Sequence, residues 1–420
     1  MDKTQPTPLP RVARFENLGF GLFLHYGLYS LLGKGEWIQD FQKTPVEEYA
    51  KLKDQFTATG FNGRAIARLA RESGMRYACM GTRHHEGFSL YDTRGLDDFD
   101  APHSPAGRDL VAEFVEGCRA EGVVPFFYHT TLDWRWDSQH CSDAKFDEYL
   151  DYLNASVEIL CANYGEIGGL WFDGNWSRPD ADWKEDRLYA TIRKHQPEAI
   201  IVNNTGLVAR GALGHPELDS TTFEQGLPTT PDRSGWPKYL AGEMCETMNV
   251  HWGVGANDLA FKSPAQLIEH LGACRKVGAN YLLNVGPQAD GSIGEYETAA
   301  LRVLGRWTSY AKDAIYTAKP VPEATCAGRD FLLRDGNRLF YFAHALTQEG
   351  SAHVVADGSG NGPKSITGLG CRIASARWLD DQKAVPFLQD DTGQLITLHC
   401  HGYDYGTNLV VRVAELTLEA

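Results

Sequence analysis

The sequence predicts a (β/α)8-like barrel followed by a C-terminal antiparallel β-sandwich, and three observations support this prediction. The chain of 420 residues is longer than one ordinary domain. Short apolar runs alternate with helical patterns roughly eight times over most of its length, which implies a parallel sheet. After about residue 315 the pattern changes to short alternating runs separated by turn residues. We therefore expect a barrel domain over residues 1–317 and a sandwich domain over residues 318–420.

The predicted barrel strands are short apolar runs that each end in a polar or glycine-containing segment. Helical patterns separate most of them, and the later strands are the weaker ones. An open doubly wound sheet is the alternative, but no G-x-G-x-x-G motif follows the first strand, so we favour the closed barrel. The predicted strands cover residues 20–27, 76–82, 123–129, 168–173, 199–204, 221–224, 243–246 and 280–285, and the predicted helices cover residues 45–55, 63–73, 107–121, 143–163, 183–195 and 263–277.

The C-terminal part begins with a linker that contains two prolines, residues 318–322. Short runs with period-two alternation follow, and turn residues such as those of 335–337 separate them. This pattern is typical of a small antiparallel sandwich. The predicted strands cover residues 331–334, 339–343, 373–379 and 408–413.

Composition excludes several classes of protein. A net charge of −15 provides no basic stripe for phosphates, so we expect no nucleic-acid partner and no anionic membrane surface. No run of about 18 apolar residues exists that could span a bilayer. The polar N-terminus lacks the apolar core of a signal peptide, which predicts a cytoplasmic protein unless a leader has been removed. Nine cysteines without a CxxC pair predict reduced thiols rather than disulfides or structural zinc.

One strand stands out because it ends on a carboxylate. The run Gly168-Gly169-Leu170-Trp171-Phe172 leads to Asp173, and Gly174 follows. The carboxyl ends of barrel strands are where barrel enzymes place their catalytic groups. An aspartate in this position can also cap the next helix, and its spacing alone does not distinguish the two roles.

The other predicted strands end in groups that suit a polyhydroxylated ligand. Imidazole, amide and phenol groups supply donors and acceptors for sugar hydroxyls, and indole rings supply apolar faces for C–H surfaces. A phosphorylated ligand would call for arginines, lysines or a glycine-rich helix start, which are scarce here. The polar residues are His25, His84, His85, Tyr128, His129, Asn203 and Asn204, and the indoles are Trp37, Trp134, Trp171 and Trp252.

The adjacent histidines His84 and His85 leave several roles open. They can ligate a metal, contact a ligand or fill the core, but no H-E-x-x-H motif or nearby acidic cluster completes a metal site. No G-x-S-x-G motif supports a serine hydrolase. Two carboxylates that face sugar-binding groups are suited to glycoside hydrolysis, for which no cofactor is expected.

Six motifs resemble glycoside hydrolase family 29, the α-L-fucosidases, over about residues 15–315. This resemblance implies a (β/α)8-like catalytic domain with a C-terminal sandwich, and retention of configuration by double displacement. The motifs lie at Gly21–Gly27, Gly35–Trp37, His84–Phe88, Leu132–Trp134, Leu170–Gly174 and Tyr281–Gly291.

The resemblance also assigns roles to individual residues. Asp173 matches the catalytic nucleophile of the family. The residues matching positions around the fucose are His25, His84, His85, Tyr128 and Trp171, and Glu36 and Trp37 match a further pair near the pocket. With Asn203, Glu243 and Trp252, these residues form our predicted substrate site. Retention requires the two catalytic carboxyl groups to lie about 5–5.5 Å apart.

Three glutamates are candidates for the acid/base. Glu217 resembles the position used by the subfamily that prefers α-1,3/1,4-linked fucose, and we favour it. Glu243 resembles the glutamate of other members, and Glu224 is the third candidate. Each can instead be an ordinary charged residue in a surface salt bridge.

One departure from the sequence pattern of the family supports assignment to the subfamily that prefers α-1,3/1,4-linked fucose. Many members carry an Asp-Arg pair after the fifth strand, where this chain has Asn204-Thr205. We therefore expect a retaining exo-α-L-fucosidase that removes α-1,3/1,4-linked fucose from Lewis-type oligosaccharides or glycoconjugates. The alternatives are a broad-specificity fucosidase or a transfucosidase on the same site, a fucose-binding protein whose catalysis has lapsed, and a metal-dependent hydrolase. The sequence does not predict the oligomeric state.

Overall fold

The computed structural model describes residues 6–205, 207, 209–233, 236–350 and 362–419. Contacts within the chain divide it into two compact units. The first comprises Met1–Lys262 and Ala279–Arg302, and the second comprises Ser263–Gly278 and Val303–Ala420. This division places α9 (Pro264–Lys276) and much of α10 (Glu295–Tyr316) with the C-terminal strands. The boundary after residue 317 stays a prediction that rests on the change from helices to short strands.

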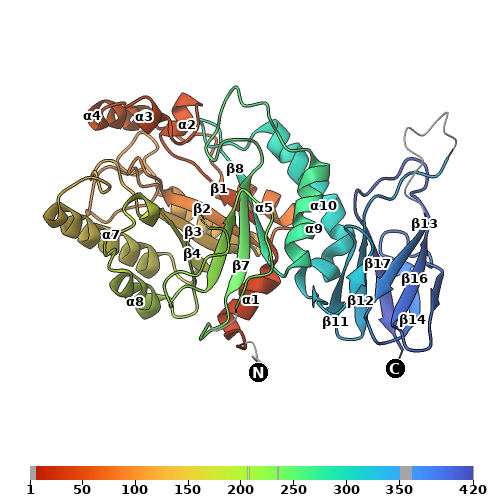
Figure 1. Cartoon of the computed structure of the whole chain (residues 1–420). Helices are drawn as coiled ribbons and strands as arrows, with labels where there is room; N and C mark the ends of the chain where they lie inside the picture. The colour runs from red at the N-terminus through yellow and green to blue at the C-terminus, as the bar shows by residue number, and fades with distance from the viewer. Residues whose placement is uncertain (1–5, 206, 208, 234–235, 351–361, 420) are drawn as a thin grey trace. The chain divides into compact units, whose positions relative to one another are not determined.

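The first unit contains a closed barrel of eight parallel strands, which confirms the predicted fold class. The strands follow one another around the barrel in chain order, and β8 pairs with β1 to close it (Figure 1). In sequence the strands are β1 (Phe20–Leu24), β2 (Tyr77–Arg83), β3 (Val124–Thr130), β4 (Gly169–Asp173), β5 (Ile200–Asn203), β6 (Ser220–Glu224), β7 (Ala241–Thr247) and β8 (Asn280–Val285). Their residues are almost all buried, as expected for strands that helices cover on one face and a packed interior on the other.

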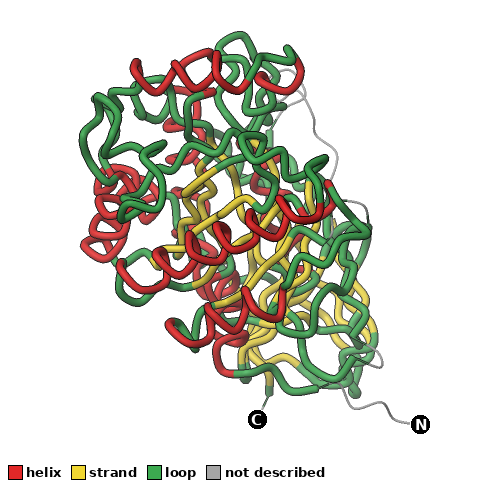
Figure 2. Tube along the Cα trace, turned by 90° about the vertical axis from the view of Figure 1, so that its left-hand side faces the viewer, coloured by secondary structure: helices red, strands yellow, loops and turns green. Residues whose placement is uncertain are grey.

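Helices surround this barrel, as Figure 2 shows in red around the yellow strands. Helices α5 (Gly63–Glu72) and α6 (Leu110–Glu121) pack closely where Gly63 and Gly117 face each other. A Cβ atom on Gly63 would lie 2.3 Å from the carbonyl oxygen of Glu113, so this approach requires glycine. The helices of the unit are α1 (Pro10–Leu18), α2 (Tyr29–Leu32), α3 (Ile38–Phe41), α4 (Val46–Tyr49), η1 (Ala50–Gln55), α5 (Gly63–Glu72), α6 (Leu110–Glu121), α7 (Asp143–Asn163), η2 (Asn175–Ser177) and α8 (Glu185–His195).

Helix α1 closes the amino-terminal end of the barrel. Phe15 packs against Tyr77 and Phe126, with ring centroids 5.8 Å and 5.7 Å away. The side chain of Asn280, at the start of β8, donates a hydrogen bond to the carbonyl oxygen of Phe15. This packing fills the interior of the barrel at its amino-terminal end. We did not predict this helix from the sequence.

The second unit contains two antiparallel sheets, which confirms the predicted sandwich. One sheet has the strand order β10-β13-β16-β15, and the other has the order β14-β17-β12-β11-β9. Their facing side chains form one apolar core, which includes Leu339, Tyr341, Trp378 and Leu398. The strands are β9 (Lys319–Pro320), β10 (Thr325–Cys326), β11 (Phe331–Asp335), β12 (Arg338–Ala343), β13 (Gly362–Thr367), β14 (Ile373–Trp378), β15 (Phe387–Gln389), β16 (Leu395–Cys400) and β17 (Arg412–Leu418).

None of the helices in the described ranges is long and apolar enough to cross a membrane.

Candidate active site

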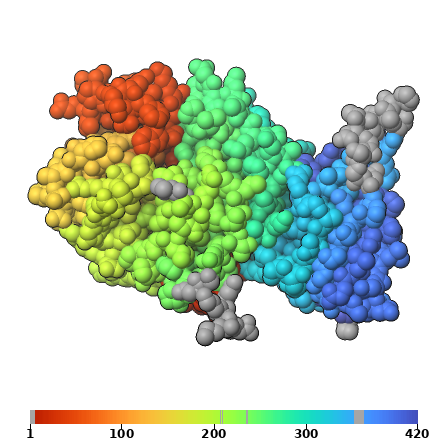
Figure 3. Space-filling view, in the orientation of Figure 1, coloured from red at the N-terminus to blue at the C-terminus, as the bar shows by residue number. Residues whose placement is uncertain are grey.

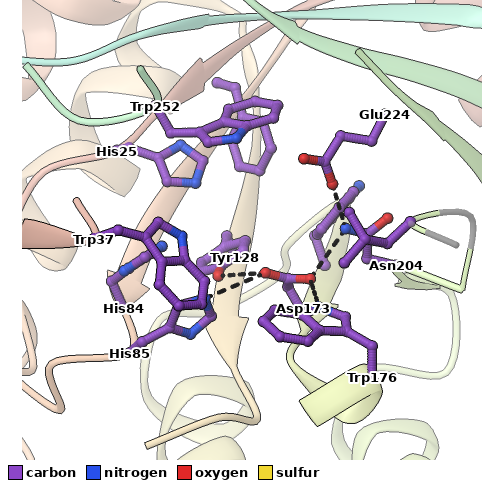
Figure 4. A pocket seen from close by; sticks show the side chains of 13 residues that line it. His25, Trp37, His84, His85, Tyr128, Asp173, Trp176, Asn204, Glu224 and Trp252 are labelled. Atoms are coloured by element: carbon purple, nitrogen blue, oxygen red, sulfur yellow. Dashed lines mark hydrogen bonds and ion pairs between the residues drawn. The ribbon is translucent and has the colours of Figure 1, made fainter. Parts of the chain in front are cut away.

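A pocket of about 140 Å³ opens at the carboxyl end of the barrel (Figure 4). A cavity of roughly 150 Å³ accommodates one six-membered ring, so this pocket has the size for a single monosaccharide. Strands β1 to β6 supply much of its wall through their last residues or the loops that follow. The lining residues are Phe23, His25, Trp37, His84, His85, Tyr128, Trp171, Asp173, Trp176, Asn204, Leu207, Glu224 and Trp252.

Asp173, the last residue of β4, lies at the centre of the pocket. Its Oδ1 accepts hydrogen bonds from Trp176 Nε1 at 2.8 Å and from Asn204 Nδ2 at 3.0 Å. Its Oδ2 accepts one from the hydroxyl of Tyr128 at 3.2 Å and lies 3.6 Å from His85 Nε2. These donors fix the orientation of the carboxylate. Asp173 caps no helix, because η2 begins after Gly174 without a side-chain cap and α8 begins after Lys184.

The turn after β4 brings Trp176 back onto Asp173. Gly174 has a φ of 127°, and a Cβ atom there would lie 2.3 Å from the backbone nitrogen of Leu132, so only glycine fits. Asn175 then ties the turn to its surroundings. Its side chain donates to Glu185 Oε1 at 3.0 Å and accepts a hydrogen bond from the hydroxyl of Thr131 at 2.7 Å. The position of the Trp176 indole therefore depends on contacts outside the pocket.

Glu224, the last residue of β6, is the second carboxyl group in the pocket. Asn204 Nδ2 donates to Glu224 Oε2 at 2.6 Å as well as to Asp173 Oδ1 at 3.0 Å. Because one nitrogen contacts both oxygens, these oxygens lie at most about 5.6 Å apart. The hydroxyl of Thr222 donates to Asn204 Oδ1 at 3.1 Å, which orients the amide so that its NH2 group faces the two carboxyl groups.

The surroundings of Glu224 favour its protonated form. Burial, followed by the negative charge of Asp173, raises the pKa of Glu224 to about 7, although the hydrogen bond from Asn204 acts in the opposite direction. A carboxyl group with this pKa holds a proton for a large part of the time at neutral pH. It can therefore donate a proton in one step and accept one in another.

The histidines of the pocket are neutral. Burial lowers the pKa of His25 to about 3 and also lowers the pKa values of His84 and His85. The side chain of Asn284 donates to the carbonyl oxygen of Trp252, so its Oδ1 accepts from His25 Nδ1 at 2.7 Å. His25 Nε2 is then an acceptor that faces the pocket. Neutral imidazoles with this arrangement suit hydroxyl groups rather than an anion.

Aromatic rings enclose the space between these polar groups. Phe23 forms the inner surface and packs against His25, Tyr128, Trp171 and Trp252, with centroids 4.6 to 5.9 Å away. Trp37 also lines the pocket and packs against His85, Trp134 and Trp176, at 5.2, 5.3 and 5.9 Å. Rings and hydroxyl-binding groups together suit a sugar with one apolar side.

The structure does not bring Glu217 to this pocket, which corrects the expectation that it is the acid/base. Glu217 precedes the first residue of β6, so it lies near the amino-terminal end of the barrel. Its side chain is 49% exposed, and its Oε2 lies 3.4 Å from Arg193 Nε. Glu217 is therefore not at a strand end that faces the pocket, despite the short sequence similarity around it. Glu224 is at such an end.

Three further predicted residues lie beside the pocket rather than in it. Glu243 is inside the barrel, where it accepts hydrogen bonds from Trp171 Nε1 at 2.9 Å and from the hydroxyl of Tyr77. Asn203 points out of the barrel and donates to Glu185 and Tyr189 at 3.1 and 3.0 Å. Glu36 is buried and accepts a hydrogen bond from the backbone of Gly253 at 2.8 Å, next to Trp252.

Several residues that line the pocket were not predicted as site residues from the sequence. Phe23, Trp176 and Leu207 were not singled out, and Asn204 was noted only with its neighbour Asn203. A signal existed for Asn204, because alternate residues of a strand face opposite sides and only one of the two amides can face the barrel interior. Trp176 depends on the tight turn at Gly174, which the sequence alone does not define. Within the described parts of the chain, no group of three or more His, Cys, Asp or Glu side chains could hold a metal ion.

Barrel enzymes carry their catalytic groups at the carboxyl ends of the strands, and two neighbouring carboxyl groups among sugar-binding rings at those ends define a glycoside hydrolase. Residues 2–313 match the family model described as alpha-L-fucosidase, and the chain belongs to this family. The tissue alpha-L-fucosidases of Mus musculus and Homo sapiens are 28% and 27% identical to it over 347 residues, which cover 74% of this chain and 72% and 70% of those proteins.

Solved structures agree with this assignment. The alpha-L-fucosidase isoenzyme 1 of Paenibacillus thiaminolyticus is 31% identical, with a TM-score of 0.81 over 98% of this chain and 99% of that one. The alpha-fucosidase of Thermotoga maritima is 24% identical, with a TM-score of 0.75 over 99% and 98% of the two chains, and shows the same fold. The chain is therefore an α-L-fucosidase whose substrate carries fucose.

Replacing Trp176 with phenylalanine tests the hydrogen bond to Asp173 while keeping an aromatic ring. We expect kcat to fall about tenfold, because a hydrogen bond to a charged group contributes about 1.5–3 kcal/mol and its loss leaves the carboxylate less well oriented. Trp183→Phe is the matched control, since Trp183 Nε1 donates to the carbonyl oxygen of Arg178 and does not line the pocket. Equal kcat values for the two variants would contradict the role of Trp176.

Proposed function

We propose that the protein is a retaining exo-α-L-fucosidase in which Asp173 is the nucleophile and Glu224 is the acid/base. The observation that carries this proposal is the short distance between the two carboxyl groups, whose oxygens lie at most about 5.6 Å apart. Retaining enzymes place the two groups about 5–5.5 Å apart, whereas inverting enzymes need roughly 6.5–9.5 Å to accommodate a water molecule.

In the first step, an oxygen of Asp173 attacks the anomeric carbon of fucose while the bond to the leaving oxygen breaks. Glu224 transfers its proton to that oxygen, so the aglycone leaves as an alcohol. In the second step, the Glu224 carboxylate takes a proton from water, the water oxygen bonds to the anomeric carbon, and Asp173 is released. Asn204 donates to both carboxyl groups throughout and stabilises the negative charge as it passes from one to the other.

The remaining pocket residues recognise fucose. The neutral histidines accept hydrogen bonds from hydroxyl groups, and Phe23, Trp37, Trp171 and Trp252 contact the apolar parts of the ring. The pocket has room for one ring, which supports removal of a terminal sugar. Glu36 and Glu243 serve this site indirectly, because they hydrogen bond to the backbone next to Trp252 and to the indole of Trp171.

We further propose α-1,3- or α-1,4-linked fucose on branched, Lewis-type oligosaccharides as the substrate. The position of Glu217 removes one of the two sequence arguments for this linkage. The other argument remains, because Asn204 and Thr205 occupy the place of the Asp-Arg pair that many relatives carry. Asn204 hydrogen bonds to both catalytic carboxyl groups, so this departure lies within the pocket itself.

The nucleophile is tested by covalent labelling. We expect 2-fluoro-fucosyl fluoride to modify Asp173 alone, because the fluorine slows release of the fucosyl-enzyme more than its formation. The same reagent is named in a solved structure of a Bacteroides thetaiotaomicron alpha-L-fucosidase, described as a trapped covalent intermediate. Mass spectrometry of the digested protein locates the label, and Asp173→Asn should abolish it. A label on another side chain would refute the assignment.

The acid/base is tested by the pH dependence of kcat/KM and by substitution. Because Glu224 must be protonated for the first step, activity should decline as the pH rises through about 7. Glu224→Ala should lose this decline, lower kcat/KM on an oligosaccharide by about 10²–10⁴-fold, and regain turnover with azide on an activated aryl fucoside. Glu217→Ala is the matched control and should behave like the parent. If Glu217→Ala lost activity while Glu224→Ala behaved like the parent, Glu217 would be the acid/base instead.

The linkage is tested by comparing kcat/KM for four fucosylated oligosaccharides. We expect the Lewis a and Lewis x trisaccharides and 3-fucosyllactose to be cleaved faster than 2′-fucosyllactose. The first three carry fucose in α-1,3 or α-1,4 linkage beside a galactose, whereas 2′-fucosyllactose carries it in α-1,2 linkage, so the comparison measures recognition of the linkage and the aglycone. Preference for 2′-fucosyllactose would refute the proposed linkage without affecting the two catalytic roles.

A further inference from the structure

Glu185, the first residue of α8, lies outside the catalytic pocket and does not line it. Figure 3 shows the segment of α8, in yellow-green, at the surface of the barrel unit. The Oε1 atom of Glu185 accepts three hydrogen bonds, from Asn175 Nδ2 at 3.0 Å, from Asn203 Nδ2 at 3.1 Å and from the hydroxyl of Tyr189 at 2.9 Å. One oxygen therefore joins η2, β5 and α8.

Two of these donors are sequence neighbours of the residues that hold the carboxylate in the pocket. Asn175 precedes Trp176, and Asn203 precedes Asn204. Trp176 Nε1 and Asn204 Nδ2 both donate to Asp173 Oδ1, as the dashed lines in Figure 4 show. Both hydrogen bonds to this oxygen therefore come from residues whose neighbours are bonded to the start of α8.

The local backbone explains how one residue outside the pocket acts on two side chains inside it. In β5 successive side chains point to opposite faces of the sheet, so Asn203 faces α8 and Asn204 faces the pocket. In the 3-10 helix η2 successive residues are about 120° apart, so Asn175 and Trp176 also point in different directions. A displacement of Asn175 or Asn203 therefore moves the backbone that carries the donor in the pocket.

A simpler role for Glu185 is to place a negative charge at the amino-terminal end of α8, where such a charge is favourable. Asp186, the next residue, shares this role, since both acidic residues lie in the first turn of the helix. Its side chain, however, is 97% exposed and lies 2.9 Å from His215 Nε2. The contacts to η2 and β5 are made by Glu185 and not by Asp186, and its partners are neutral amide and hydroxyl groups rather than cations.

We propose that Glu185 is a positioning residue for the nucleophile, because its carboxylate fixes both donors of Asp173 Oδ1 at once. The proposal rests on the proposed role of Asp173 and extends it to a residue outside the pocket. Without this acceptor, η2 and the end of β5 gain freedom, and the carboxylate spends less time oriented for attack. The histidines that bind fucose lie on other strands, so the loss affects kcat rather than KM.

Three substitutions test this role. Glu185→Ala removes the acceptor, and we expect kcat on an activated aryl fucoside to fall about tenfold while KM stays within about twofold of the parent. Glu185→Gln keeps an oxygen that accepts the same hydrogen bonds, and its kcat should stay within about threefold of the parent. Asp186→Ala is the matched control, because it removes a charge from the same helical turn without touching η2 or β5, and it should behave like the parent.

A double-mutant cycle with Trp176→Phe shows whether the effect passes through the donors in the pocket. In the Trp176→Phe background, Glu185→Ala should lower kcat by about threefold or less, since one of the two donors is already lost. A further tenfold loss would overturn the proposal, and so would equal losses in Glu185→Ala and Asp186→Ala. If Glu185→Ala fails to fold, Asn175→Ala removes the contact from the η2 side and should lower kcat about tenfold. An unchanged kcat in that variant would also overturn the proposal.

A crystal structure of Glu185→Ala separates this proposal from the proposed function. We expect the distance from Trp176 Nε1 to Asp173 Oδ1, which is 2.8 Å in the parent, to exceed about 3.5 Å. If 2-fluoro-fucosyl fluoride labels another side chain of the parent but this distance increases in the variant, Glu185 still holds the donors of Asp173 and the proposed nucleophile is wrong. If Asp173 carries the label and neither donor has moved, the proposed function stands and the role of Glu185 falls.

Discussion

The site depends on one side-chain amide that two carboxyl groups share. Asn204 donates one hydrogen bond to Asp173 and one to Glu224, and Thr222 holds the amide in the orientation that makes both possible. Two carboxyl groups this close in a buried pocket repel each other when both are charged. The amide reduces that repulsion and fixes their separation. The β4, β5 and β6 ends must therefore align, which the parallel barrel provides.

The two carboxyl groups differ in what surrounds them, and this difference assigns their roles. Asp173 accepts hydrogen bonds from an indole, an amide and a phenol, whereas Glu224 accepts one from the shared amide. Burial raises the pKa of Glu224, and the nearby charge of Asp173 adds to this effect. A single proton shared by the pair therefore resides on Glu224. Neutral histidines complete the arrangement, because they bring hydroxyl-binding groups close without adding positive charge.

Sequence patterns predicted the barrel, the sandwich and the strand ends that form the pocket, because apolar runs and their periodicity directly reflect burial. The choice between Glu217 and Glu224 went wrong although the predicted strand over residues 221–224 already ended on Glu224 and left Glu217 before it. The short sequence similarity around Glu217 outweighed this signal, because the strand itself was weakly predicted. The sequence patterns could not separate Asn203 from Asn204, since the two amides differ only in the face of the strand they occupy. Trp176 reaches the pocket through a turn that no periodicity describes.

Glu243 shows why a raised pKa is not enough to identify an acid catalyst. Burial raises its pKa to about 7, as it does for Glu224. The hydroxyl of Tyr77 and the indole of Trp171 occupy its two oxygens, and Glu243 does not line the pocket. A proton on Glu243 therefore has no direct route to a substrate, and the residue is suited to holding Trp171 in place. Glu224 has the same raised pKa and also lines the pocket. Access to the leaving oxygen therefore distinguishes the acid catalyst, Glu224, from the supporting residue, Glu243.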